Sequence, residues 1–525
     1  MLRVLSLLVA ASALPAANPF QPTIAPNGVV NAASYFTQAF PRYGIARGSM
    51  FLVFGSALGP VDLVQASSFP LPTTDGLAGT RVLISLGGYN ATCPMVYTSL
   101  TQIAAIMPSN APEGDGSLVV SYQNLASTSV PIRIVRNAFG LFTRNQAGSG
   151  PAIVQNFVSQ TSTPLNSLAN SATPGQTVIL WGTGLGPVTG DETAGPLPGS
   201  LAVLDNLYVG GIQASVRYAG RSGCCAGIDQ VVFDVPAGIS GCYVPVTAVT
   251  GGVVSNMGTI SVANSGGNCD DPLDVRSATI AAAQRNGNLR SGQVTLTSQS
   301  SGQVEFDGTF TTTDVNTFLA DDARVNVPGG ACDLSVSRVD AASARRPGGL
   351  NAGSSIRVSG PPGTFDVSNT SSGGYSMQLA QATLSQGSYA ITSTGGSDVG
   401  PFSATLNLPA PAVWSNMAAY SVSALPAGAP FTFTWSGGDP SGYVTLRVAS
   451  ANAIYNSTVQ CNVASTAGTF TIPAWLANAL YAGPITVSLT SNSGPLAFTA
   501  TGLDFGTILA ARTASVQTTL QAPAQ

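Results

Sequence analysis

The chain has 525 residues, only 8% of them charged, and a formal net charge of −4. It contains no histidine, and all 19 of its basic residues are arginine, which excludes a Ser-His-Asp triad, a Cys-His pair, a Schiff-base lysine and a Walker-type phosphate loop. The arginines are scattered without a basic stripe, so a nucleic-acid interface is excluded as well.

The first residues have the pattern of a secretory signal. Arg3 precedes an apolar stretch at residues 4–14, and small residues suited to cleavage follow it. The stretch is too short to span a bilayer, which needs about 20 apolar residues. We therefore predict a signal peptide at residues 1–17 and a linker at residues 18–30. The mature chain is expected to be secreted or at the cell surface, with no membrane insertion after signal cleavage.

A repeated motif organises the next part of the chain. Residues 48–60 read GSMFLVFGSALGP, and residues 175–187 read GQTVILWGTGLGP. Each copy is a short apolar run that stops at a glycine-rich corner. Short runs rich in Val, Ile and aromatic residues follow, with turn signals roughly every 8–12 residues, as in a sandwich. This pattern predicts β-sandwich units at residues 31–136 and 165–263, joined by a connector at residues 137–164.

The remaining chain also predicts strands. Short apolar runs bounded by turn residues indicate an all-β region at residues 264–409, either as one unit or as two subdomains divided near residues 346–348. Its best helix candidate surrounds the Ile-Ala-Ala-Ala run at residues 280–283. A last sandwich is predicted at residues 412–513, and a loose tail at residues 514–525. The predicted fold class is therefore all-β, with tandem immunoglobulin-like β-sandwich domains.

Several short motifs resemble those of known immunoglobulin-like repeats. They are VNAASY at 30–35, LPTT at 71–74, YTSLTQI at 97–103, VGGI at 209–212 and YAG at 218–220. Together with the glycine-bounded opening strand, they resemble the IPT/TIG class and, more closely, an uncharacterised family of secreted acidobacterial repeats. The resemblance covers about residues 30–263, and the Cys224-Cys225 loop departs from it. It implies the fold and an exported location, but no activity and no catalytic residues.

Carboxylate chemistry is the enzymatic option that the composition leaves open. Glu305 and Asp307 occupy alternate positions of a predicted strand, so their β-carbons share a face at about 7 Å, near the separation that a glycosidase needs. A solvated strand face is the competing and favoured interpretation. The predicted function is a non-catalytic binding, spacer or adhesion protein without a cofactor, whose partner is a polysaccharide or an envelope protein. A carboxylate-based glycan-active enzyme is the alternative.

Two acidic pairs suggest a further hypothesis. Asp270-Asp271 and Asp321-Asp322 lie near predicted domain edges, where calcium would stiffen a string of sandwiches. Neither pair matches an EF-hand loop, and simple solvation of the loops is the favoured interpretation.

The four tryptophans divide into two groups. Trp181 and Trp435 lie in strand-like apolar runs, so they are predicted to be core residues. Trp414 and Trp475 are nearer to predicted loops, so they are the candidates for a binding surface.

The seven cysteines can form disulfides in an exported protein, and their odd number leaves at least one thiol over. In the predicted hairpin, one strand separates Cys225 from Cys242 by some 20 Å at about 3.3 Å per residue, too far for a bond. Cys242 and Cys269 fall at the same end of the meander. We predict Cys242–Cys269, with Cys224–Cys225 as a vicinal disulfide or two thiols; Cys269–Cys332 is the rival pairing.

Overall fold

The structure is a computed structural model. It describes residues 20–201, 203–270, 276–299, 302–320, 331–339, 348–371, 373–379 and 384–522. The predicted signal peptide therefore lies outside the described residues. Strands make up 54% of the structure and helices 6%, which confirms the predicted all-β fold with tandem immunoglobulin-like sandwiches. Among the described residues, none of the helices combines the length and the apolar character needed to cross a membrane.

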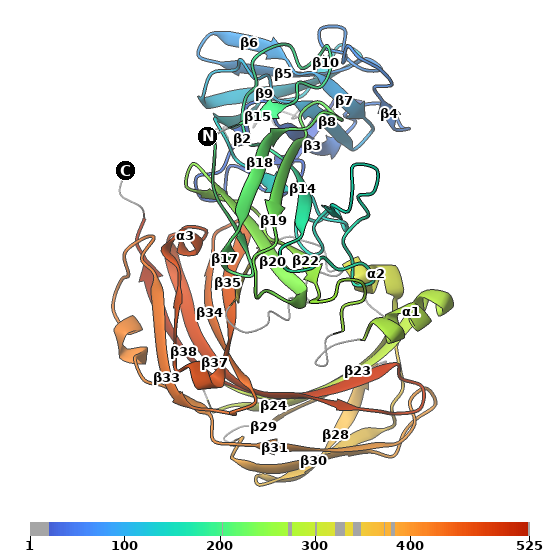
Figure 1. Cartoon of the computed structure of the whole chain (residues 1–525), viewed down its shortest axis with the longest axis vertical. Coiled ribbons are helices and arrows are strands. Elements are labelled where there is room, and N and C mark those ends of the chain that lie inside the picture. Colours follow the sequence, from blue (N-terminus) through green and yellow to red (C-terminus); the bar gives the residue numbers. More distant parts are fainter. Residues whose placement is uncertain are drawn as a thin grey trace, which may run out of the picture.

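The first unit, blue in Figure 1, is a sandwich of two sheets. One has the order β1 (Thr23–Asn31), β3 (Met50–Ser56), β8 (Gln102–Ile106), β7 (Met95–Thr98), β4 (Val64–Gln65). The other has the order β2 (Ile45–Ala46), β11 (Val130–Val135), β9 (Gly114–Tyr122), β5 (Thr80–Leu86), β6 (Tyr89–Thr92), with β10 (Leu125–Ala126) beside β9. Most of the stretch predicted as a linker is thus the strand β1. It accommodates Pro26 because its pairing with β3 shifts register between Ile24 and Val29.

The second unit, green in Figure 1, has the same two-sheet plan. One sheet has the order β12 (Gly140–Leu141), β14 (Thr177–Thr183), β19 (Asp229–Asp234), β18 (Ser215–Arg221), β15 (Gly199–Ser200), with β13 (Val154–Asn156) beside β14. The other has the order β17 (Ile212–Gln213), β16 (Leu204–Val209), β20 (Gly241–Thr250), β21 (Val253–Val254), with β22 (Gly258–Val262) beside β20. The strands β12 and β13 come from the stretch predicted as a connector, which therefore contributes to this sandwich.

One 13-stranded sheet dominates the rest of the chain. Its order is β25 (Ala331–Arg338), β35 (Tyr455–Ala464), β34 (Tyr443–Ala451), β37 (Gly483–Phe498), β38 (Phe505–Leu520), β23 (Asn288–Ser298), β24 (Val304–Asp314), β29 (Gly374–Leu379), β28 (Gly363–Ser371), β27 (Ser355–Gly360), β30 (Gly387–Ser393), β31 (Phe402–Leu408), with β26 (Gly348–Gly349) beside β24. A small sheet contains β32 (Ala412–Trp414), β33 (Phe431–Gly437) and β36 (Thr469–Ile472). The helices are α1 (Ser277–Asn286), α2 (Val315–Ala320) and α3 (Ala474–Ala477), with 3-10 turns at Met417–Tyr420 and Ser465–Ala467.

This sheet runs across the predicted division between residues 409 and 412. The strand β23 pairs in parallel with β38, from Ser291 opposite Phe505 to Ser298 opposite Arg512. Residues 514–520 of the predicted tail are also part of the sheet, because β38 continues to Leu520, which is buried. A parallel pair between distant segments leaves no local signal in the sequence, which is why the division differs from the structure.

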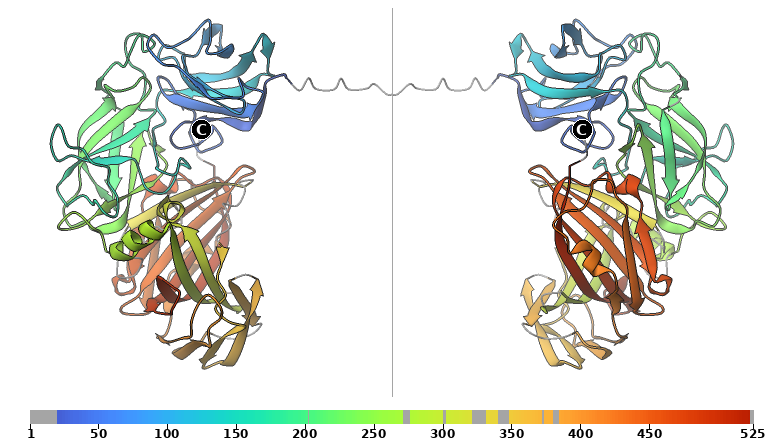
Figure 2. Two further views of the ribbon diagram at one scale, coloured as in Figure 1. Left: turned by 90° about the vertical axis from the view of Figure 1, so that its right-hand side faces the viewer. Right: turned by 90° about the vertical axis from the view of Figure 1, so that its left-hand side faces the viewer.

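A single hydrophobic cluster joins the three parts of the molecule. It contains Phe40 and Tyr43 from the loop after β1, Met257 from the second unit, and many residues of the large sheet. The ring of Phe40 meets that of Tyr481 edge to face, with centroids 6.2 Å apart. Figure 2 shows the two N-terminal units beside one end of the sheet, where this cluster forms. The parts therefore share core rather than forming a loose string.

Candidate functional site

A cavity of about 460 Å³ lies where the second unit meets the helices α1 and α2. Cavities of this size at domain junctions are typical small-molecule sites. Its apolar floor includes Leu168, Ile280 and Leu319, and Leu168 also packs against both neighbouring hydrophobic clusters. The polar residues that line it are Arg144, Asn166, Ser167, Tyr243, Thr259, Ser261, Asn268, Ser277, Gln284 and Asn316.

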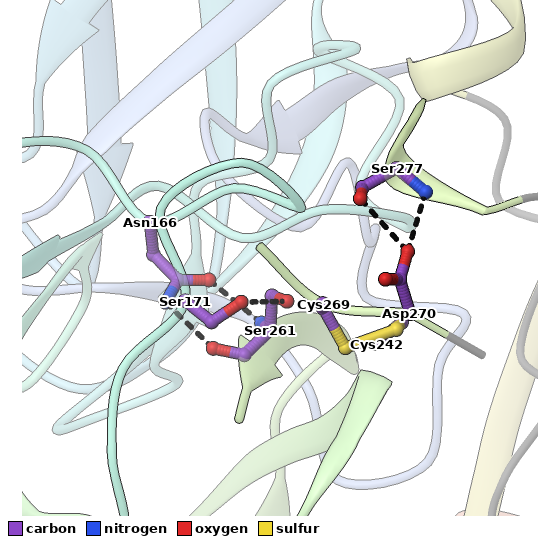
Figure 3. Close-up of a disulfide and its surroundings, with 7 residues drawn as sticks. All are labelled: Asn166, Ser171, Cys242, Ser261, Cys269, Asp270 and Ser277. Atoms are coloured by element: carbon purple, nitrogen blue, oxygen red, sulfur yellow. Dashed lines mark hydrogen bonds between the residues drawn. A yellow bond between two sulfur atoms is a disulfide. The ribbon is translucent and has the colours of Figure 1, made fainter. Parts of the chain in front are cut away.

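One wall of the cavity is fixed by a disulfide and by buried hydrogen bonds. Cys242 at the start of β20 is joined to Cys269, with α-carbons 5.5 Å apart, and the Cys269 backbone N–H donates to the Leu168 carbonyl oxygen at 2.7 Å. Figure 3 shows the adjoining network, in which Asn166 bonds both backbone groups of Ser261. These polar groups are buried and hydrogen-bonded, so the wall is already ordered. The protein therefore loses little conformational entropy when a ligand contacts this wall.

The opposite wall is the helix α1. Its first residue, Ser277, donates from its backbone N–H and its hydroxyl to one oxygen of Asp270, each at 2.8 Å (Figure 3). These hydrogen bonds hold the pKa of the exposed Asp270 carboxyl below its usual range. The helix itself forms because Ile280 and Ala283 share one face, which packs with Phe318 of α2. The carboxylate thus anchors the helix beside the second unit.

The described lining of the cavity is mostly uncharged. Amides and hydroxyls provide its hydrogen-bonding groups, and the described residues that line it include one arginine, the exposed Arg144, and no carboxylate. The arrangement suits an uncharged ligand with an apolar body and several polar groups.

The cysteines occupy the following places. Cys224 is joined to Cys225, one of the two states that the sequence allows, and Cys242 is joined to Cys269. The rival pairing, Cys269–Cys332, is not formed. Instead Cys332 of β25 is joined to Cys461 of β35, which lies directly opposite in register. This pairing escaped the sequence analysis because β25 crosses to the far edge of the sheet. The remaining thiol, Cys93, is buried, and burial raises its pKa.

The carboxylate pair lies on one strand of the large sheet, away from the cavity. Glu305 and Asp307 share one face of β24, as predicted, and both are half-buried. The Gln378 side-chain amide donates to Glu305 at 3.0 Å, which ties this carboxylate to the neighbouring strand. Burial raises the pKa of Asp307, and the Ser376 hydroxyl lowers it in part. Neither residue lines the cavity, so the alternative of a glycan-active enzyme gains no support here.

The calcium hypothesis receives only a partial answer. Asp270 is engaged by Ser277, whereas Asp271, Asp321 and Asp322 lie outside the described residues. Within the described ranges, no group of three or more acidic or cysteine side chains is placed to hold a metal ion.

Two tryptophans, Trp414 and Trp181, differ from their predicted positions. Trp414 is buried in the shared core, where its ring stacks on Phe433 at 5.2 Å. Trp475 is half-buried against Tyr208 of the second unit, so it joins two parts of the molecule. Trp181 is half-buried on the outer face of its sheet rather than in the core. Each difference arises because strand registers and unit contacts, which decide burial, are not local properties.

Trp435 is buried as predicted, and its indole N–H donates to a backbone carbonyl at 2.7 Å.

A buried ionic centre escaped the sequence analysis. The guanidinium of Arg221 at the end of β18 is wholly buried and lies 2.8 Å from Glu192, and it also bonds Asp229. The Ser109 hydroxyl of the first unit donates to Glu192 at 2.8 Å. The centre therefore helps to join the two N-terminal units. A lone arginine far in sequence from Glu192 and Ser109 gives no signal of such a contact.

The fold and the cavity define a multidomain β-sandwich protein with a preformed cavity at the junction of its parts. No protein-family model matches the chain, and no curated protein matches it. Among solved structures, it is similar to a tetra-tandem repeat from the extending region of a large adhesion protein, with 11% identity and a TM-score of 0.14 over 93% of this chain and 98% of that one.

A second similar structure is SGBP-B of the Bacteroides ovatus mixed-linkage glucan utilization locus, in complex with a mixed-linkage heptasaccharide. The identity is 11% and the TM-score 0.14, over 86% of this chain and 98% of that one. A third is domains 5–6 of the S-layer protein SbsC, at 14% identity and a TM-score of 0.15, over 47% of this chain and 100% of that one.

Proposed function

We propose that the chain is an exported, non-catalytic β-sandwich protein that serves as a rigid binding or spacer element, secreted or held at the cell surface. Its partner is a polysaccharide or an envelope protein, and its first two units belong to the IPT/TIG type. The observation that carries this proposal is the hydrophobic cluster shared by all three parts, because a shared core fixes the relative positions of the surfaces. The disulfides support export, since they persist in oxidising compartments.

Small-angle X-ray scattering of the purified secreted protein tests the rigid arrangement. We expect one compact particle whose scattering fits the structure. A broad distribution of extended shapes would overturn the proposal, because it would mean that the units move independently.

A glycan array with a parallel reducing-sugar assay tests binding against turnover. Binding without sugar release supports the proposal, and release that is lost in Glu305→Gln would overturn it. The variant Ala281→Trp, on the exposed face of α1 that lines the cavity, is expected to abolish binding of ligands that enter the cavity. Asn286→Trp, on the same helix and away from the cavity lining, is the matched control.

A further inference from the structure

Both N-terminal units carry an aromatic ring at the same place on an outer sheet face. Phe54 of β3 lies opposite Gln102 of β8, and in the second unit Trp181 of β14 lies opposite Gln230 of β19. Alternate side chains of a strand point to opposite faces. Since the neighbours of these aromatic residues enter the two sandwich cores, the rings themselves face outward. Each ring is half-buried.

Other rings connect these two positions across the junction between the units. Tyr35, Phe54, Tyr97 and Phe142 pack in one outer-face cluster, in which the rings of Tyr35 and Phe54 stack at 6.3 Å. The register of β12 with β14, extended by one residue, places Phe142 opposite Trp181. Their backbones are hydrogen-bonded there, N–H of Phe142 to the carbonyl oxygen of Trp181 at 3.0 Å. We call these five residues the aromatic strip.

Two polar atoms of the strip, on Trp181 and Tyr97, are held in place by glutamine side chains. The indole N–H of Trp181 donates to the Gln155 side-chain oxygen at 2.8 Å, and the Gln102 amide donates to the Tyr97 hydroxyl at 2.8 Å. Burial raises the pKa of Tyr97 to about 12, so its hydroxyl is neutral at all ordinary pH values. The rings are therefore fixed before a ligand arrives, which limits the entropy lost on binding.

The chemistry of the strip selects one kind of partner. The strip and its glutamines carry no charge. Arg217 and Asp234, which lie on the same sheet as Trp181, form an ion pair at 2.7 Å and so neutralise each other. A shallow groove of about 390 Å³ runs beside Phe54 and Gln102. A pyranose ring offers an apolar C–H face that suits an aromatic ring, and hydroxyls that suit an amide. Because the rings extend over two units, the fitting ligand is long.

We propose that the aromatic strip binds a neutral polysaccharide, with one subsite at Phe54 and Gln102 and a second at Trp181 and Gln230. This inference rests on the proposed function and gives it a site and a ligand class. When one polymer occupies both subsites, binding at the first raises the effective concentration at the second. The affinity for a polymer is therefore much higher than that for a single sugar.

Affinity electrophoresis in native gels tests the proposal. The gels contain hydroxyethylcellulose or xylan as neutral probes and alginate as a polyanionic control. We expect the full chain to be retarded by a neutral polymer and not by alginate. Trp181→Ala and Phe54→Ala are each expected to weaken binding about tenfold, and the double variant about a hundredfold. Ile212→Ala, 48% exposed on the other sheet of the second unit, is the matched control and should bind as the unaltered chain does.

Gln230→Ala removes a half-buried amide without changing the core. It therefore tests the second subsite if Trp181→Ala fails to fold. If the strip variants are retarded as strongly as the unaltered chain, the aromatic strip is not the binding site, and the proposed binding function is unaffected. Absence of retardation by both neutral polymers would overturn the strip as a polysaccharide site. A dimer that becomes a monomer in Trp181→Ala would instead assign this face to contact between copies. Release of reducing sugar would contradict the proposed function itself.

Discussion

Tyr208 of the second unit stacks face to face on Trp475 of the C-terminal region, with ring centroids 4.3 Å apart and ring planes inclined by 3°. Tyr208 belongs to β16 and Trp475 to α3. The stack therefore joins the second unit to the C-terminal region, and these two parts have no β-sheet in common. A cavity of about 290 Å³ adjoins it and is lined by Met257 and Phe470 among others. The stack therefore links the second unit to the C-terminal region at the edge of the shared core.

Replacing Trp475 by alanine should weaken the contact between the second unit and the C-terminal region. Stacked aromatic pairs contribute about 0.5–1.5 kcal/mol beyond the area that they bury, so we expect the free energy of unfolding to fall by about 1–3 kcal/mol. Urea unfolding measures this loss, and faster limited proteolysis between the second unit and the sheet should accompany it. Trp475→Phe, which keeps a ring, is the control and should retain most of the stability. An unchanged midpoint for Trp475→Ala would show that the stack does not hold the parts together.

Arg221 should be essential for the junction of the two N-terminal units. In Arg221→Met, the buried carboxylates of Glu192 and Asp229 lose their cation, and breaking a buried pair in this way costs about 3–5 kcal/mol. Thermal unfolding provides the measurement.

The triple variant Arg221→Met, Glu192→Gln, Asp229→Asn is the matched test, since it leaves no buried charge. It should recover much of the lost stability. If the triple variant is as unstable as the single one, Arg221 stabilises the junction by the packing of its side chain and not by neutralising the two carboxylates.

The stability of the chain should depend on pH through Asp229. Burial raises the pKa of this carboxyl from 3.8 to about 6, although Arg221 partly opposes the shift. Between these values the folded protein keeps a proton that the unfolded chain has released. The free energy of unfolding contributed by Asp229 therefore falls as pH rises through this window, and it is constant above it.

Urea unfolding at a series of pH values measures this effect as the difference between the unaltered chain and Asp229→Asn. The difference removes the opposite trend of carboxyls whose pKa values are lowered, such as that of Asp234. A difference that stays flat from pH 4 to pH 6 would contradict the assignment.

The disulfide between Cys242 and Cys269 should stabilise both the second unit and the cavity wall. Non-reducing peptide mapping is expected to recover the two cysteines in one linked pair of peptides. Cys242→Ser with Cys269→Ser should lower the free energy of unfolding by about 2–4 kcal/mol. Linkage of Cys242 to any other cysteine would contradict the structure. Cys93→Ser, at the buried free thiol, provides the control for the loss of a cysteine without loss of a disulfide.

The sequence by itself determined the fold class and the repeat. The short apolar runs, the glycine-rich corners and the shared position of Phe54 and Trp181 are local patterns, and strand alternation makes local patterns informative. The absence of histidine and lysine likewise removed whole classes of catalysis without any structure.

Only the tertiary structure decided which distant segments meet. The parallel pairing of β23 with β38, the bond between Cys332 and Cys461, and the centre around Arg221 all join residues far apart along the chain. The half-buried position of Trp181 and the burial of Trp414 depend on the same distant contacts. Register and unit contacts set these features, and their free energy comes from the packing of surfaces that no short stretch of sequence contains.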